Sequence, residues 1–132
     1  MNARKKLFSH PLPYDTQKTD SLFVAAMREN ALFQYIHSPT YKKILDQKRF
    51  HPQDIQTMDD LAKLPFIPTV YFKHHEFYSM PKRSMLIKAT SSGTSSGIKS
   101  HIGFNAESLW RGWGMVRRVF AYHKIWSLRP QR

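Results

Sequence analysis

A run of small polar residues in the second half of the chain has the composition of an anion-binding loop. Residues 90–100 hold five serines, two threonines, two glycines and one lysine, and no carboxylate. Glycines let successive backbone N–H groups turn toward one anion, and the hydroxyl and ammonium groups add further donors. The alternative is a flexible Ser/Gly linker. Apolar residues flank the run on both sides, so the sequence favours a phosphate-binding loop.

The candidate phosphate-binding residues each offer a hydroxyl group, a glycine backbone or a positive charge. They are Ser91, Ser92, Gly93, Thr94, Ser95, Ser96, Gly97, Lys99 and Ser100. A Walker A loop requires glycine directly before the lysine, but Ile98 precedes Lys99 and the glycine stands one residue earlier. The G-x-G-x-x-G dinucleotide fingerprint is absent as well. The loop therefore predicts phosphate binding of another type.

Two short strands and a helix are expected to position this loop. The apolar pattern predicts one strand over residues 84–89 and a second over residues 101–104, so the loop should join two strands and should not open a helix. Asn105 is the expected N-cap of a final helix. At helical spacing four apolar residues of that helix share one face and are expected to be core: Leu109, Trp113, Val116 and Phe120.

The residues before the loop carry helix signals. A helix is predicted over residues 20–37, capped by Thr19 or Asp20. Ser38 followed by Pro39 predicts the start of a second helix, which should run to residue 47. Thr57 and the carboxylate three residues later resemble a capping box for a short helix through residue 62. Residues 71–73 are expected to form a turn or short helix.

The element order predicts a partial α/β fold in four parts. Residues 1–19 are expected to be an irregular basic lead-in, because prolines at 11 and 13 disfavour helix. Residues 20–83 form a helical N-terminal region, residues 84–121 begin a nucleotide-binding α/β domain, and residues 122–132 are a tail where we expect truncation. Two or three strands cannot make a full buried sheet, so we expect the start of a larger protein.

Composition limits the partners. The 132 residues hold 21 Lys plus Arg against 9 Asp plus Glu, a formal charge of +12 that favours anionic ligands. No cysteine is present, and no apolar run approaches the ~20 residues of a membrane span. We therefore expect a cytoplasmic protein without a membrane span. His74, His75 and Glu76 are adjacent and point apart on regular backbone, so a metal site is not expected there.

A second motif precedes the loop. It has the form L-x-x-[IL]-P-x-[IL]-P-x-x-x-F-K, and its residues are Leu61, Leu64, Pro65, Ile67, Pro68, Phe72 and Lys73. This motif followed by a Ser-Ser-Gly-Thr loop that ends in serine resembles the LuxE-type acyl-protein synthetases, a branch of the adenylate-forming (ANL) superfamily. These bacterial enzymes supply fatty acids to the bioluminescence reductase complex. The resemblance covers about residues 20–120.

By this resemblance the protein activates a fatty or other carboxylic acid with ATP. The acid would form an acyl-adenylate with release of pyrophosphate, and the acyl group would pass to a protein thiol. ATP and Mg²⁺ are the implied cofactors, and a reductase-like acyl-acceptor protein is the implied partner. No protein ligand of Mg²⁺ is identified in the sequence, and a nucleic-acid partner is not expected.

The resemblance also implies roles within the loop. Ser92 and Thr94, with Ser95 or Ser96, would donate hydrogen bonds to the β- and γ-phosphates. The two glycines would permit the turn, Ser100 would close the loop, and Lys99 would add a cation outside the family pattern. Phe66, Tyr71 and Phe72 are expected to pack under the loop or, alternatively, to line an acyl channel.

The sequence departs from the family pattern in three respects. Ser95 and Ser96 stand where the pattern has one residue, so either the loop bulges or one serine is not equivalent. The catalytic lysine and the adenine and ribose motifs are expected beyond residue 132, and no cysteine matches the acyl-accepting one. We therefore expect an N-terminal fragment that does not complete acyl transfer alone. A basic nucleic-acid-binding module and a non-functional remnant are the alternatives.

Overall fold

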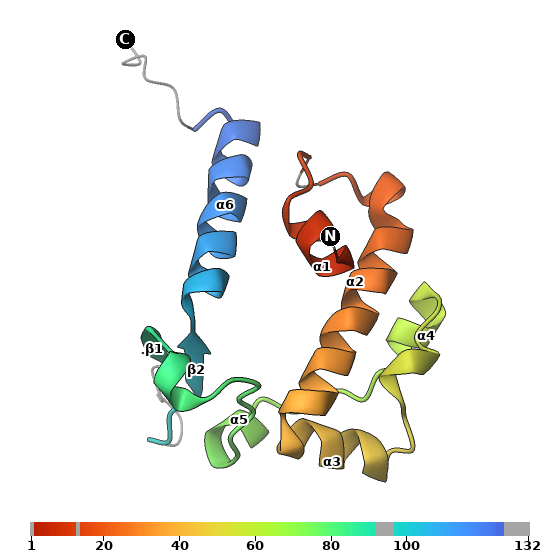
Figure 1. The fold of residues 1–132 in the computed structure, drawn as a ribbon, viewed down its shortest axis with the longest axis vertical. Coiled ribbons are helices and arrows are strands. Elements are labelled where there is room, and N and C mark those ends of the chain that lie inside the picture. Colours follow the sequence, from red (N-terminus) through yellow and green to blue (C-terminus); the bar gives the residue numbers. More distant parts are fainter. Residues whose placement is uncertain (1, 13, 92–96, 126–132) are drawn as a thin grey trace.

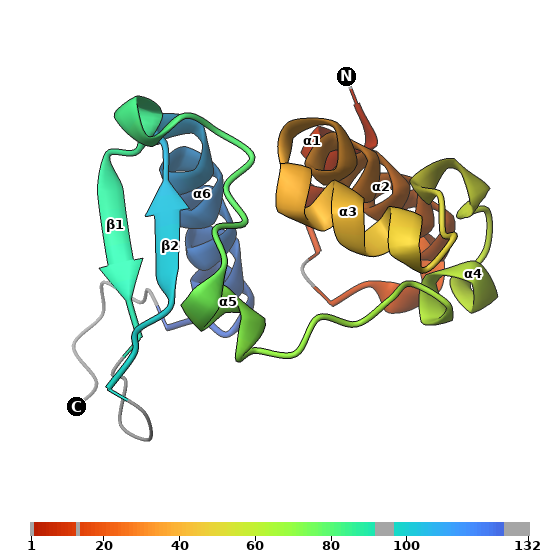
Figure 2. The same cartoon turned by 90° about the horizontal axis from the view of Figure 1, so that it is seen from below.

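The computed structural model describes residues 2–12, 14–91 and 97–125. It combines helices with one two-stranded antiparallel sheet, in agreement with the partial α/β fold predicted at this coarse level. Helices α1 to α4 form one group, and strands β1 and β2 with helix α6 form another (Figure 1). The short helix α5 lies on the chain that crosses between the two groups (Figure 2).

The helical group is built on the long helix α2 (Thr16–His37). Helices α1 (Ala3–Phe8), α3 (Pro39–Gln47) and α4 (Met58–Ala62) contact it, as does the 3₁₀ turn Pro52–Asp54. Its buried core consists of small and branched apolar side chains, with larger ones packed around them: Val24, Ala31, Ile55, Phe50, Leu61 and Leu64.

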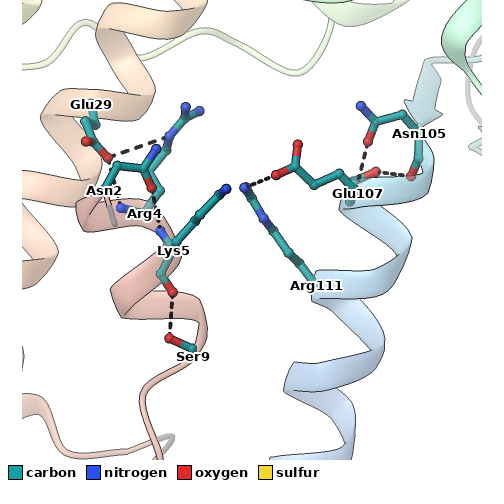
Figure 3. A network of polar contacts seen from close by, with 9 residues as sticks. Asn2, Arg4, Lys5, Ser9, Glu29, Asn105, Glu107 and Arg111 are labelled. Carbon is teal, nitrogen blue, oxygen red and sulfur yellow. Dashed lines mark hydrogen bonds and ion pairs between the residues drawn. The ribbon is translucent and has the colours of Figure 1, made fainter.

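Helix α1 contradicts the irregular lead-in predicted for residues 1–19. The prolines at 11 and 13 follow the helix, so they limit its length without preventing it. The Asn2 side chain accepts a hydrogen bond from the Lys5 N–H and caps the first turn. The Arg4 N–H donates to the Glu29 carboxylate at 2.9 Å (Figure 3). The Arg4 guanidinium lies 4.7 Å from the Phe33 ring centre. These contacts attach α1 to α2.

The start of α2 also differs from the prediction, because the helix begins at Thr16 and not near residue 20. The Thr19 hydroxyl donates to the Asp15 carbonyl at 2.6 Å, which is a bond within the helix and not a cap. The other predicted caps are confirmed. The Ser38 hydroxyl accepts from the Tyr41 N–H, and Thr57 forms a complete capping box with Asp60 at the start of α4.

The Asp60 carboxylate holds this capping box together. It accepts hydrogen bonds from the N–H groups of Gln56 and Thr57 and from the Lys63 ammonium. The ammonium bond is the largest of the effects that hold the pKa of Asp60 well below its usual value. At pH values above about 4, the pKa of Asp60 in the unfolded chain, the capping box contributes its full stabilisation. This contribution is lost as the pH falls through the lower pKa that Asp60 has in the folded chain.

Replacing Asp60 with asparagine is expected to destabilise the chain at pH 7 and to have less effect in acid. The substitution removes the negative charge on which the hydrogen bonds with Lys63 and Thr57 depend. Urea denaturation of both proteins at pH 7, 5 and 3 measures the difference in unfolding free energy. That difference should change little between pH 7 and pH 5 and be smaller at pH 3, where the Asp60 carboxylate of the unfolded chain takes up a proton while that of the folded chain stays ionised. A difference that stays constant over this range would contradict the assignment.

The sheet pairs β1 (Ile87–Thr90) with β2 (His101–Phe104), with Ile87 opposite Phe104 and Thr90 opposite His101. The second strand was predicted correctly, but the first begins three residues later than predicted. Lys82–Ser84 form a 3₁₀ turn instead, in which the Ser84 N–H donates to the Pro81 carbonyl at 2.9 Å. Proline presets the backbone angle of such a turn, so local geometry delays the strand.

Helix α6 (Ala106–Tyr122) follows β2, and the Asn105 side chain caps it as predicted by accepting from the Ser108 N–H. The face predicted to be core is wrong in part, because Trp113 is 54% exposed and Val116 is exposed as well. Helix α6 contacts α1 and β2, and Met115 and Val119 on another face line the space toward α1 and α2. The apolar pattern identified an apolar face of α6, but among the described residues the helix packs through a different face.

Candidate functional site

The two ends of the Ser/Gly loop are joined by backbone hydrogen bonds. Residues 91–100 connect β1 to β2, so the segment lies between two strands and does not open a helix. The Ser91 N–H donates to the Ser100 carbonyl at 3.1 Å, and the Ser100 N–H donates to the Ser91 hydroxyl oxygen at 2.9 Å. The ends of the loop are thereby held at a fixed separation on the sheet.

Four of the nine predicted phosphate-binding residues can be placed. Ser91 and Ser100 close the loop, Lys99 is exposed beside them, and Gly97 has a φ of 68°. This left-handed conformation favours glycine, although an added Cβ would meet nothing within 4 Å. The other five, Ser92, Gly93, Thr94, Ser95 and Ser96, lie outside the described residues. Phosphate binding by the nine residues stays a prediction.

A cavity of about 430 Å³ lies beside the end of the loop. Helix α5 (Tyr71–His74) and residues 75–80 form one wall, and residues 101–103 of β2 form the other. Figure 2 shows α5 on the side of β2 that faces away from β1. Since His101 directly follows Ser100, the cavity begins one residue from the hydrogen bonds that close the loop. We call it the β2-edge cavity.

Cationic and apolar side chains share the lining of the β2-edge cavity. Lys73 is the lysine of the lining, and the imidazole rings of His74, His75 and His101 offer ring nitrogens for hydrogen bonds. Glu76 is the only carboxylate among the described lining residues, and it pairs with the Lys82 ammonium. This hydrogen bond raises the pKa of Lys82 above its usual value. The lining therefore suits an anion.

The apolar part of the lining is aromatic in character. The Phe72 and Phe77 rings are tilted against each other with centres 4.7 Å apart, and Ile102 projects from the opposite wall. Phe72 therefore lines the β2-edge cavity, and an acyl channel stays a prediction. Phe66 does not pack under the loop, because it is 87% exposed and lies on a different cavity with Tyr71 and residues of α3.

The backbone of β2 adds hydrogen-bond donors to the cavity. In an antiparallel pair, residues alternate between those bonded to the partner strand and those whose N–H and C=O groups point away. The Ser91 N–H bond to Ser100 fixes this alternation, with Ser100 and Ile102 facing β1. The N–H groups of His101 and Gly103 therefore face the outer edge of β2, where the β2-edge cavity lies.

Sequence reasoning found the loop but missed this cavity. It treated Lys73 as a motif residue without a position relative to the loop, whereas the structure places it with Phe72 on a wall of the β2-edge cavity. His101 and residues 77–80 were not singled out. The available signal was the predicted pairing of the two strands, because it leaves the far edge of the second strand open.

The described residues set limits on other kinds of site. No group of three His, Cys, Asp or Glu side chains among them could hold a metal ion. No helix in the described ranges is long and apolar enough to cross a membrane.

A family model described as acyl-protein synthetase, LuxE, matches residues 5–131. The matched segment includes the Ser/Gly loop, the Phe72-Lys73 motif and both walls of the β2-edge cavity. No curated protein matches the chain.

Proposed function

Because the chain belongs to the LuxE family of acyl-protein synthetases, we propose that it takes part in ATP-dependent activation of a fatty or other carboxylic acid. The carboxylate attacks the α-phosphate of ATP, an acyl-adenylate forms and pyrophosphate leaves. The acyl group then passes to a protein thiol, and a reductase-like acyl acceptor is the proposed partner. The match over residues 5–131 is the observation that carries this proposal.

In this proposal the loop of residues 91–100 holds the β- and γ-phosphates. Hydroxyl groups and backbone N–H groups donate to the phosphate oxygens and stabilise the charge that builds up on the leaving pyrophosphate. The hydrogen bonds between Ser91 and Ser100 support this role, because they preorganise the ends of the loop on the sheet. The left-handed Gly97 supplies the turn that brings the chain back to β2.

The remaining parts of the reaction need groups that the described residues do not supply. Mg²⁺ accompanies ATP in the proposal and would neutralise phosphate charge. The ion has no assigned protein ligand among the described residues; Mg²⁺ in such sites usually keeps several waters and binds substrate phosphates. The chain has no cysteine, so the accepting thiol comes from outside these 132 residues.

Binding of MgATP to the chain, measured by titration calorimetry, tests the proposal. The contacts are made to the β- and γ-phosphates, so pyrophosphate should compete with ATP and AMP should not. Exchange of labelled pyrophosphate into ATP, stimulated by added fatty acid, is the companion assay for the chemical step. Equal affinity for ATP and AMP would contradict the proposal. Binding of DNA or RNA with a steep salt dependence and no competition by ATP would favour the nucleic-acid module.

Replacing Lys99 with methionine is expected to lower the affinity for MgATP by about two- to fivefold, because an exposed cation contributes modestly in water. Lys99 is exposed at the end of the loop. Lys88→Met is the matched control, since Lys88 is also exposed but lies in the middle of β1. The same titration measures both variants, and an equal effect of the two substitutions would show a general influence of net charge only.

A further inference from the structure

We propose that the β2-edge cavity binds the carboxylic acid substrate. The carboxylate lies at the cationic end beside Lys73 and His101, and the hydrocarbon chain lies along Phe72, Phe77 and Ile102. This inference rests on the proposed function, because it names the place at which the same reaction takes up its second substrate.

Position relative to the loop is the first argument. The carboxylate must reach the α-phosphate, which adjoins the β- and γ-phosphates assigned to the loop. His101 is the first residue of β2 and follows Ser100, which closes the loop through its bonds to Ser91. A carboxylate held beside His101 is therefore next to the end of the phosphate-binding segment.

Polarity of the lining is the second argument. A fatty acid is an anion with an apolar tail, and the cavity presents the Lys73 ammonium and imidazole rings together with paired aromatic rings. The N–H groups at the outer edge of β2 supply neutral donors to a carboxylate. Glu76 would repel an anion, but its charge is balanced by Lys82. The volume of about 430 Å³ lies within the ordinary range of small-molecule sites, which is roughly 300–1,000 Å³.

A second cavity of about 390 Å³ is the competing location. It lies between α1, α2 and α6, and its lining is more apolar, including Leu12, Phe23, Met115 and Val119. Met115 is ten residues along α6 from Asn105, which corresponds to about 15 Å of helix rise beyond the end of β2. An acid bound there would be too far from the loop to attack a phosphate, so the β2-edge cavity is the better site.

A cavity-filling variant provides the main test. Ile102→Trp should weaken the binding of decanoate to the chain at least about tenfold, because the indole would occupy the space of the acyl chain. Ile87→Trp is the matched control and should change binding less than about twofold. Ile87 is on the neighbouring strand with a similar exposure, 49% against 56% for Ile102, and it does not line the cavity. Equal decanoate affinity in the two variants would overturn the proposal.

A charge variant tests the position of the carboxylate without changing the shape of the cavity. Lys73→Met should lower the affinity for decanoate about fivefold and leave that for decanol unchanged, since decanol has the same chain without the charge. Lys88→Met should change neither. A purely structural role of Lys73 would lower both affinities together, and that result would overturn the assignment of the carboxylate end.

Three further measurements distinguish a failure of this inference from a failure of the proposed function. Val119→Trp fills the second cavity, so loss of decanoate binding in that variant instead of Ile102→Trp would overturn the proposal. Absence of decanoate binding by the unsubstituted chain would overturn it as well. MgATP binding is measured on the same samples without acid. If MgATP fails to bind while decanoate binding responds to Ile102→Trp, the acid site stands and the triphosphate assignment of the loop fails.

Discussion

Replacing Thr94 with valine is expected to lower the affinity of the chain for MgATP at least tenfold. The hydroxyl of Thr94 is proposed to donate to a phosphate oxygen, and a hydrogen bond to a charged group contributes about 1.5–3 kcal/mol. Its loss corresponds to roughly ten- to more than a hundredfold in affinity. Valine has nearly the same shape, so the substitution removes the donor with little change in volume. Calorimetric titration with MgATP measures the effect.

Thr90→Val is the matched control for this experiment. Thr90 is exposed at the end of β1, opposite His101, and a β-branched residue suits that strand position. It should therefore leave the affinity for MgATP within about twofold of the unsubstituted value. An unchanged affinity in Thr94→Val would remove this hydroxyl from the proposed phosphate contacts. A similar loss in both variants would point to a disturbed sheet.

The elements predicted correctly from sequence depend on local chemistry. Ser38, Thr57 and Asn105 each accept a hydrogen bond from an N–H group three residues later, so a few neighbouring residues determine the start of the helix. The loop between two strands was predicted for a similar reason, because glycine and serine interrupt two short apolar segments. Helix α1 escaped prediction because contacts across 25 residues, such as Arg4 with Glu29, attach it to α2.

The candidate site was predictable only in part for the same reason. Residue types were sufficient to identify the loop, but Lys73 and His101 are 28 positions apart, and nothing in their spacing indicates that they line one cavity. For two aromatic residues the predicted burial was wrong. Trp113 and Phe66 lie in apolar patterns that predict burial, yet 54% of Trp113 and 87% of Phe66 are exposed. A pattern shows which face of an element is apolar, whereas tertiary contacts decide whether that face is covered.

The core of the helical group makes the second large prediction. Ile55→Ala is expected to lower the free energy of unfolding by about 2–4 kcal/mol, because the side chain is completely buried and its removal leaves a cavity. Ile55 packs with Val24 and Ala31 of α2, so the loss weakens the contact on which the group is built. Denaturant unfolding followed by circular dichroism measures the change.

Ile36→Ala is the control. Ile36 is 64% exposed on α2, so its replacement should lower the free energy of unfolding by well under half as much as Ile55→Ala. The comparison also bears on the site. Ile55 does not line the β2-edge cavity, so at temperatures where Ile55→Ala remains folded its affinity for decanoate should match that of the unsubstituted chain. If binding falls before the helical group unfolds, the wall formed by α5 and residues 75–80 depends on that group for its position. Two connections would transmit the change, because Gln34 of α2 lines the cavity and residues 63–70 join α4 to α5.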